Sequence, residues 1–188
     1  VMSASDLYLN EHREYGLSTY SLHSDGSGVC YSSRLRPILN MRPKYRHWLS
    51  PSLWQLNGDL HLTDWLEEKG FDFDVLTDED LHIEGVDLLN RYQCVLTGSH
   101  PEYSSEKMIA AYEAYQLQGG RWIYLGADGF YWISEYHPDN PNIIEVRKGE
   151  AGTRAWTANP GEYNNAFDGK FGGMWRARGR IPTKVCGL

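Results

Sequence analysis

Two apolar stretches decide the fold of this chain: RYQCVLTG at residues 91–98 and RWIYLGADG at residues 121–129. Each is a nearly continuous apolar run that ends in glycine and polar residues, which is typical of a buried parallel strand. Between them, residues 104–118 repeat apolar side chains with helical spacing, and Ser104 is the expected N-cap. The apolar face of that helix would consist of Met108, Ala111, Tyr112 and Tyr115. Strand, helix and strand in this order predict an α/β fold with a parallel sheet.

The segments upstream of this unit extend the same pattern. DLHLTDWLEEK at residues 59–69 has the spacing of an amphipathic helix, with Asp59 as a plausible N-cap and Gly70 as the stop. FDFDVLT at residues 71–77 and LSTYSL at residues 17–22 alternate in polarity, so we expect a strand at each place.

Two further regions are expected to be less regular. Residues 30–48 carry Pro37 and Pro43, which interrupt regular structure, so we expect a long ordered loop. Beyond Asn142, short runs separated by Gly, Pro and Asn predict a β-rich or irregular C-terminal cover.

The length of 188 residues corresponds to one domain, at about 150 residues per domain. We expect residues 1–14, which are polar, to form a linker or arm, and residues 15–188 to form a single α/β domain. Because the chain starts at Val1 and stops directly after Cys186 and Gly187, we also expect it to be a piece of a longer polypeptide.

Composition excludes two classes of function and indicates a compartment. The net charge of −7 argues against a nucleic-acid partner, because affinity for nucleic acids comes from cations on phosphates. No stretch of about 18 apolar residues is present, so no membrane-spanning helix is expected. The cysteines, Cys30, Cys94 and Cys186, are odd in number and lack framework spacing, which favours a reducing, cytoplasmic location.

A functional site is expected where the strands end, because ligands of open α/β sheets bind at the carboxyl ends of strands. Three predicted strands end in polar sequence, at STYSLHSDG, TGSHPEY and GADGFYW. If these loops share one edge, then Tyr20, His100, Glu102 and Asp128 converge. Pro101 restricts the backbone between His100 and Glu102, so the imidazole and the carboxylate would project in defined directions, as metal binding or acid–base work requires.

Structural interpretations of the same residues remain open. Glu102 could merely favour the positive end of a helix dipole, and Tyr20 could be an aromatic packed at a strand end. Cys94 lies inside an apolar strand, where a buried and unreactive thiol is expected. Ser99 could be a nucleophile, although its flanking sequence lacks the glycines of a G-x-S-x-G turn.

The sequence also resembles a known family. The stretches that carry the resemblance are HSDGSGVCYSSRLRPIL (23–39), DLHLTDWLEEKGFDFDVLTDEDLH (59–82), TGSHPEY (97–103), GADGFYW (126–132) and GEYNNAFDGKFGGMWR (161–176). Taken together they resemble the large (beta) subunit of the N,N-dimethylformamidase family, from about Tyr15 to the C-terminus. The resemblance implies a three-layer parallel sheet of the class I glutaminase or flavodoxin-like type, without the nucleophilic cysteine of the glutaminases.

The resemblance also implies a site. The family uses a mononuclear iron, expected as Fe(III), held by two tyrosines and one glutamate. Carried over by motif, Glu102 and Tyr20 would be metal ligands, and His100 would be a catalytic histidine. Position 128 would carry a catalytic polar group beside the ligands. Relatives often have Asn there, and the extra charge of Asp128 puts that role in doubt. The second tyrosine is not placed, and Tyr103 is the local alternative.

The resulting hypothesis is an iron-dependent amidohydrolase domain that converts N,N-dimethylformamide, or a similar small formamide, to an amine and formate. A small partner subunit and a homo-oligomer are implied by the resemblance. Phe130, Tyr131 and Trp132 could form a pocket for methyl groups. The alternatives are a non-catalytic α/β scaffold that binds a partner subunit, and a glutaminase-like enzyme with Ser99 as its nucleophile.

Overall fold

The computed structural model describes residues 12–46, 52–148 and 156–187. The predicted arm, residues 1–14, lies almost wholly outside this part of the chain. The helices, in chain order, are η2 (Arg13–Tyr15), η3 (Leu39–Met41), α2 (Leu56–Lys69), α3 (Asp78–Glu84), α4 (Val86–Leu89), α5 (Glu106–Leu117), η4 (Trp175–Arg178) and α6 (Pro182–Cys186). The strands are β1 (Tyr31–Ser33), β2 (Cys94–Leu96), β3 (Tyr103–Ser104), β4 (Arg121–Ile123), β5 (Trp132–Ile133), β6 (Glu135–His137) and β7 (Asn140–Glu145).

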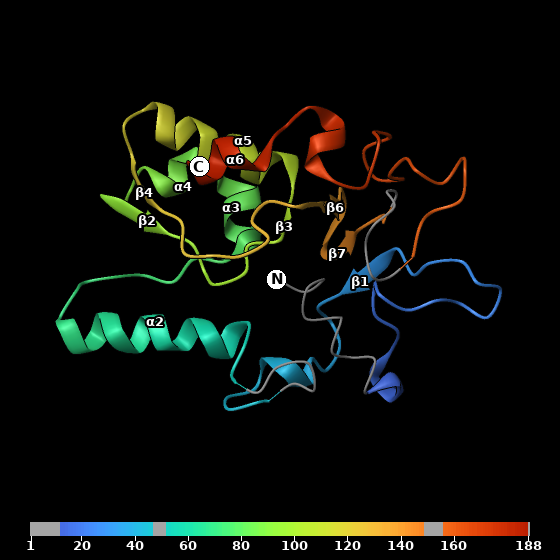
Figure 1. The fold of residues 1–188 in the computed structure, drawn as a ribbon, viewed down its shortest axis with the longest axis horizontal. Coiled ribbons are helices and arrows are strands. Elements are labelled where there is room, and N and C mark those ends of the chain that lie inside the picture. Colours follow the sequence, from blue (N-terminus) through green and yellow to red (C-terminus); the bar gives the residue numbers. More distant parts are fainter. Residues whose placement is uncertain (1–11, 47–51, 149–155, 188) are drawn as a thin grey trace.

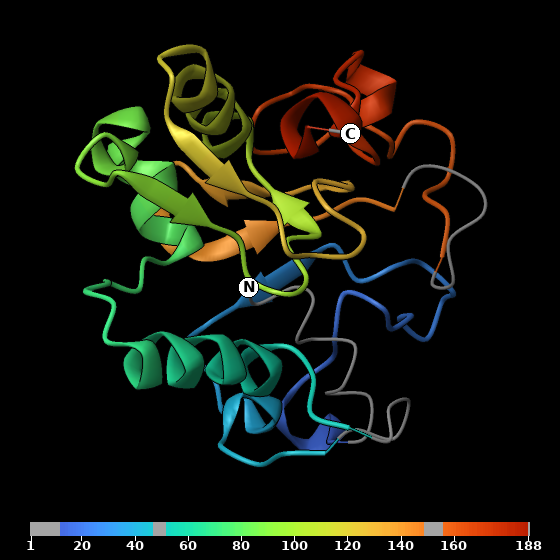
Figure 2. The same cartoon turned by 60° about the vertical axis from the view of Figure 1, so that its left-hand side comes forward.

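The architecture is mixed α/β with small parallel and antiparallel sheets (Figure 1). β2 pairs with β4 and β3 pairs with β5, both in parallel, whereas β1, β7 and β6 form an antiparallel sheet in that order. α2 lies on the opposite side of the strands from α5 and α6 (Figures 1 and 2). The parallel pairing predicted for residues 91–98 and 121–129 is therefore confirmed. A single three-layer sheet of the glutaminase type is not confirmed.

The parallel pairing is split into two short pairs for a local reason. Between β2 and β3 lies Pro101, which has no N–H to give to a ladder. Between β4 and β5, Asp128 and Phe130 both have positive φ, at 49° and 55°. These residues turn the backbone out of the extended conformation, so regular pairing stops and resumes a few residues later.

Two hydrophobic clusters hold the elements together. The larger lies between α3, α4 and α5, and it includes the predicted apolar face of residues 104–118; its buried members are Leu81, Leu88, Leu89, Met108, Ile109, Ala111, Tyr112, Tyr115, Phe130, Ile133, Trp175 and Val185. The smaller lies under β3, β5 and β7 and consists of Tyr103, Trp132, Ile144, Val146 and Met174. Phe130 is thus a core residue, which corrects its expected place in a substrate pocket.

Three predicted elements differ from the observed ones. Residues 71–77 form no strand, and Phe71 and Val75 are 55% and 72% exposed, because the extended segment meets no partner strand in the described part of the chain. Residues 17–22 form no strand: residues 18–21 make a turn, in which the Ser18 hydroxyl accepts a hydrogen bond from the backbone N–H of Tyr20, and Leu22 makes only an isolated bridge with Gly28. Residues 31–33 of the predicted loop are β1, which pairs with β7.

Both predicted N-caps are displaced. α2 begins earlier than predicted, after Gln55, and Asp59 inside it accepts a hydrogen bond from the backbone N–H of Ser99 at 2.7 Å. α5 is capped by Ser105, because Ser104 is taken into β3. The irregular C-terminal cover is confirmed in its general character, since β7 is followed by isolated bridges, η4 and α6.

Candidate active site

The segments TGSHPEY and GADGFYW run side by side, as the predicted strand-end site requires. The backbone N–H of Ala127 donates to the carbonyl of Ser99 at 3.1 Å, and that of Trp132 donates to the carbonyl of Glu102 at 2.9 Å. These bonds continue the direction of the β2–β4 pair toward β3 and β5. The loops that follow two parallel strands are therefore held together by their own backbone.

His100 lies between two carboxylates and an indole. Its Nε2 atom is 3.4 Å from Oε2 of Glu102 and 3.7 Å from Oδ2 of Asp128. On another side the Trp54 ring meets the imidazole edge to face, with 5.5 Å between ring centroids and an angle of 90°. The His100 side chain is 9% exposed and that of Glu102 is 12% exposed, whereas that of Asp128 is 65% exposed.

The surroundings of His100 favour its charged form. Burial lowers the pKa of the imidazole, but the hydrogen bond and negative charge of Glu102, together with the charge of Asp128, raise it above its ordinary value. An imidazole held between carboxylates in this way can give and take a proton near neutral pH. Of the four residues predicted to converge, His100, Glu102 and Asp128 lie together in this group, and Tyr20 is not one of its members.

Tyr20 lies in a separate group, next to the first. Its phenol oxygen is in hydrogen-bond contact with that of Tyr103, the residue that follows Glu102 in the chain. The Tyr103 oxygen also accepts a hydrogen bond from Nζ of Lys148 at 2.6 Å. The structure thus joins Tyr20 to Tyr103, and it joins Glu102 to His100, so the two groups meet at the Glu102–Tyr103 peptide.

Lys148 and Trp54 are the site residues that sequence reasoning missed. A signal for Lys148 was present, because Ile144, Val146 and Lys148 alternate along one face and the first two are buried apolar residues. Nothing in the local sequence marks Trp54. Its contact with His100 joins segments that are far apart in the chain, and the tertiary structure alone makes it.

Ser99 does not have the environment of a nucleophile. Its hydroxyl is buried and has no hydrogen-bond partner among the described residues, and its backbone N–H is bound to Asp59. A nucleophilic serine needs an adjacent general base. The described residues supply none to Ser99, so the interpretation of this chain as a serine-dependent glutaminase loses its support.

Two further kinds of residue, Asp25 at the end of the STYSLHSDG stretch and the three cysteines, have structural roles. Asp25 accepts hydrogen bonds from the N–H and the hydroxyl of Ser27, at 2.9 and 2.7 Å, which makes it a turn residue. The three cysteines are free and half-buried, and burial raises the pKa of the Cys30 and Cys186 thiols.

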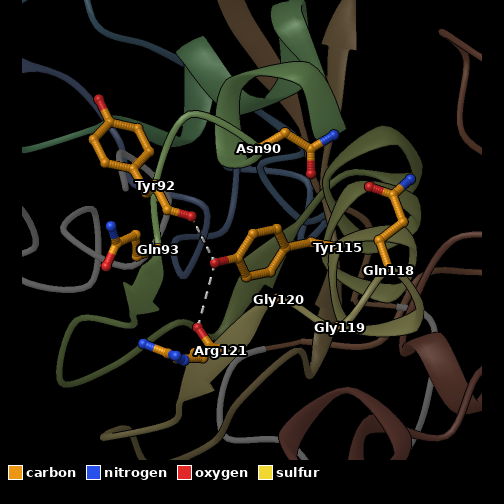
Figure 3. Close-up of a pocket in the computed structure, with 8 residues that line it drawn as sticks. All are labelled: Asn90, Tyr92, Gln93, Tyr115, Gln118, Gly119, Gly120 and Arg121. Atoms are coloured by element: carbon orange, nitrogen blue, oxygen red, sulfur yellow. Dashed lines mark hydrogen bonds between the residues drawn. The ribbon is translucent and has the colours of Figure 1, made fainter.

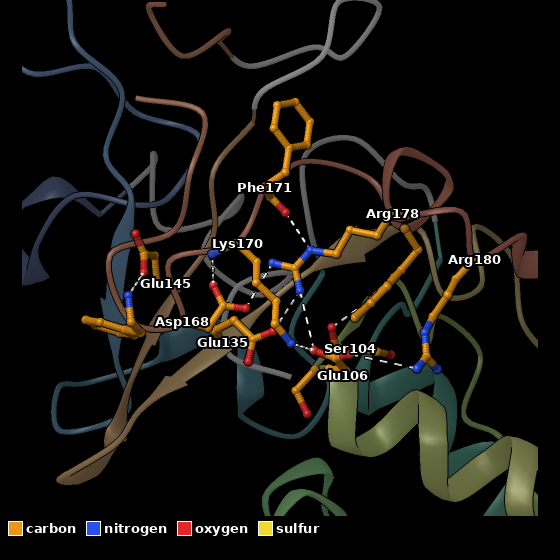
Figure 4. Close-up of polar contacts among 12 residues, drawn as sticks. Ser104, Glu106, Glu135, Glu145, Asp168, Lys170, Phe171, Arg178 and Arg180 are labelled. Atoms are coloured by element: carbon orange, nitrogen blue, oxygen red, sulfur yellow. Dashed lines mark hydrogen bonds and ion pairs between the residues drawn. The ribbon is translucent and has the colours of Figure 1, made fainter. Parts of the chain in front are cut away.

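A carboxylate cluster away from the strand ends went unnoticed in the sequence. Glu106, Glu135 and Asp168 offer oxygen atoms that lie within 4.8 Å of one another. Arg178 reaches into this cluster, with Nη2 3.0 Å from Asp168 Oδ2, and Lys170 contacts Glu106 (Figure 4). The cations already balance these carboxylates, so the cluster is an ion-pair network.

A surface hollow of about 380 Å³ lies at the other end of the parallel strands (Figure 3). It is lined by Asn90, Tyr92, Gln93, Tyr115, Gln118, Gly119, Gly120 and Arg121. These residues come directly before β2 and β4 and from the end of α5. The hollow therefore contains none of the predicted site residues, and it opens at the strand ends where ligands of α/β proteins seldom bind.

The fold and the site together define a class of protein. It is an α/β protein with a histidine, carboxylates and phenols gathered where two parallel strands end. In the part of the chain that the structure describes, no helix is both long enough and apolar enough to cross a membrane.

The chain belongs to the N,N-dimethylformamidase beta subunit-like family. The family's C-terminal part, described as "N,N-dimethylformamidase beta subunit-like, C-terminal", matches residues 8–188. Over all 188 residues the chain is 51% identical to the N,N-dimethylformamidase beta subunit of Paracoccus aminophilus and 50% identical to that of an Alcaligenes species. It spans 24% of the length of each of these relatives.

Proposed function

We propose that this chain supplies part of an amide-hydrolysing site that acts on N,N-dimethylformamide or a similar small formamide. The observation that carries the proposal is the His100–Glu102–Asp128 group, which lies beside the Tyr20–Tyr103 pair at the strand ends. Membership of the family and the names of two relatives identical at half of all positions support this choice of substrate.

The donor set suits a mononuclear iron, expected as Fe(III). Phenol and carboxylate oxygens are hard ligands, which a ferric ion prefers, and the family resemblance implies Tyr20 and Glu102 as its protein ligands. Tyr103 brings a second phenol oxygen against that of Tyr20. When bound, such an ion polarises the amide carbonyl and lowers the pKa of a coordinated water.

His100 is proposed as the acid–base residue of this chain. In the overall reaction a water oxygen bonds to the formyl carbon, the C–N bond breaks and the departing nitrogen takes a proton, so that formate and amine result. An amide anion is a poor leaving group, so a proton delivered to the nitrogen lowers the barrier. His100 Nε2 can deliver it, because the carboxylate of Asp128, 3.7 Å away, stabilises the charged imidazole.

The first test uses the full-length protein that contains this chain. Elemental analysis should find about one iron per chain, and tyrosinate bound to ferric iron should give a visible charge-transfer band. Glu102→Gln should lose the metal and the colour, whereas His100→Ala should keep both and lose amide hydrolysis by at least about 100-fold. His61→Ala, on the exposed side of α2, is the matched control and should keep metal and activity. A wild-type protein without iron and colour would contradict the metal assignment.

Assembly with another chain is part of the proposal. Its support is that the relatives are named as beta subunits, and that Trp65 and Phe71 expose apolar rings 5.8 Å apart along α2 and after it. The native mass of the full-length protein, alone and co-expressed with a dimethylformamidase small subunit, should show a homo-oligomer and a mixed complex. A protein that assembles but hydrolyses no amide under any condition would be a scaffold subunit. The cytoplasmic location stays a prediction.

A further inference from the structure

Lys148 is the most unusual buried side chain of the site. Its exposed fraction is 0%, and it follows β7 on the same inward face as Ile144 and Val146. An ammonium group taken out of water loses several kcal/mol of hydration, so it is kept inside a protein only where other groups compensate. The groups around Lys148 should therefore show which interactions keep its ammonium group buried.

The compensation comes from phenol and indole rings. Nζ of Lys148 lies 4.2 Å from the ring centroid of Tyr20, 4.3 Å from that of Trp132 and 4.6 Å from that of Tyr103. These distances are within the range of cation–π attraction, which is stronger where the cation is desolvated. The same ammonium donates to the Tyr103 oxygen at 2.6 Å. One buried cation thus binds the rings of both tyrosines and the hydroxyl of one.

The two tyrosines differ in how firmly the backbone holds them. Tyr103 is 2% exposed and belongs to β3, whose partner in β5 is Trp132. Tyr20 is half-buried and lies in a turn outside any strand. The turn alone does not fix the direction of the Tyr20 side chain, so its phenol oxygen needs a tertiary contact, and Tyr103 provides one.

We propose that Lys148 is a positioning residue, which orients the Tyr103 hydroxyl and through it holds the phenol oxygen of Tyr20 at the site. The proposal rests on the role of Tyr20 given under the proposed function. A side chain that only filled space here would be served as well by methionine, whereas positioning requires the N–H donor and the charge. Lys148→Met and Lys148→Arg therefore separate the two roles.

The first experiment needs no metal. 3-Fluorotyrosine is placed at position 20 of the full-length protein, iron is removed with a chelator, and the fluorine resonance is recorded. Lys148→Met and Tyr103→Phe should both shift and broaden that resonance, because the first removes the ammonium that contacts the Tyr20 ring and orients Tyr103, and the second removes the hydroxyl that meets the Tyr20 oxygen. Lys148→Arg should restore it in large part. Lys69→Met, at an exposed position of α2, should leave it unchanged.

The second experiment measures iron. Loss of a partner that orients a metal ligand typically weakens metal binding 10- to 100-fold. Lys148→Met should therefore bind iron about 10-fold more weakly and shift the visible band, and Lys148→Arg should lie nearer the wild type. Tyr103→Phe removes only a hydroxyl, so it tests the same path if Lys148→Met does not fold.

The outcomes separate the two proposals. A resonance that responds to Lys148→Met in a protein that never binds iron supports the positioning role and refutes the iron site. Iron that is present in the wild type, together with an unchanged resonance and an unchanged band in both Lys148→Met and Tyr103→Phe, overturns the positioning role.

Discussion

At the scale of single residues, Glu135 shows how a buried carboxylate depends on its neighbours. Its side chain is 11% exposed, and it shares the cluster with Asp168, Glu106, Lys170 and Arg178 (Figure 4). Burial, and then the negative charge of Asp168, raise its pKa to about 7, although Arg178 opposes them. Below about pH 7 the fold therefore favours the protonated form of Glu135, and above that pH it favours the ion pair with Arg178.

A pH dependence of stability follows from this pKa. The unfolded value is 4.5, so between about pH 4.5 and 7 the folded protein binds more protons at Glu135 than the unfolded protein does. Its stabilising effect is complete below pH 4.5 and is lost as the pH rises through 7. Glu135→Gln imitates the protonated form at every pH. Between pH 5 and 8 the free energy of unfolding should therefore fall less in this variant than in the wild type, and the two falls should differ by up to about 3 kcal/mol.

Urea unfolding at several pH values measures this difference. Glu68→Gln removes a carboxylate that is 71% exposed on α2, so it should follow the wild-type curve. If the free energy of unfolding changed with pH equally in Glu135→Gln and in the wild type, Glu135 would already be ionised in the folded protein at pH 5, contrary to the prediction.

At the scale of elements, α5 illustrates the difference that one residue of register makes. Ser104 and Ser105 are both good caps by residue type, and the spacing of the apolar face suits either. The pairing of β3 with β5 takes Ser104 into a strand and leaves Ser105 as the cap. The Ser105 hydroxyl then accepts from the N–H of Met108 at 3.3 Å and also contacts His82 Nδ1 at 2.7 Å.

Removal of the Ser105 hydroxyl should destabilise the protein by about 1–2 kcal/mol, because the first turn of α5 loses its acceptor. The contact with His82 is lost as well. Ser105→Ala should therefore unfold at lower urea concentration with an unchanged slope. Thr63→Ala removes an exposed helical hydroxyl that only donates back to Leu60, so it should be close to neutral. Equal stability of Ser105→Ala and Thr63→Ala would mean that water satisfies the end of α5 equally well.

At the scale of the whole molecule, Arg178 joins segments that are distant in sequence. From η4 it reaches Asp168 at 3.0 Å, Glu135 of β6 at 3.5 Å and Glu106 of α5 at 3.8 Å, and its Nε donates to the carbonyl of Phe171 at 2.5 Å. The side chain is 11% exposed. One side chain of the C-terminal cover thus contacts both the helix and the sheet, in addition to contacts such as that of Lys170 with Glu106.

Arg178→Met should destabilise the protein by about 3 kcal/mol, because several half-buried carboxylates lose their counter-charge. Arg91→Met removes a cation that is 58% exposed and paired with Glu84, and it should cost at most about 1 kcal/mol. Thermal and urea unfolding measure both variants. A loss no larger than that of Arg91→Met would show that the network contributes nothing to the attachment of the cover.

Local sequence determined much of the α/β unit and of the site. The runs before Gly98 and Gly126 specify strands because they are apolar and continuous, and the motif HPEY places His100 and Glu102 where a strand ends. The alternation of polar and apolar residues wrongly predicted a strand at residues 71–77. This segment alternates as regularly as a strand, but it has no partner strand among the described residues. The same alternation wrongly predicted a strand at LSTYSL, where the Ser18 hydroxyl binds the backbone N–H of Tyr20, a group that a strand would use in its ladder.

The sequence by itself determined the family and the parallel βαβ pairing, because continuous segments encode both, and the order of the strands predicted that His100, Glu102 and Asp128 share one edge. Only the tertiary structure decided that Tyr20 meets Tyr103, that Lys148 is buried between their rings, and that Trp54 packs on His100. Each of these contacts joins parts of the chain separated by dozens of residues. Hydrophobic periodicity says which face of an element is buried, but it does not say which distant side chain that face will meet.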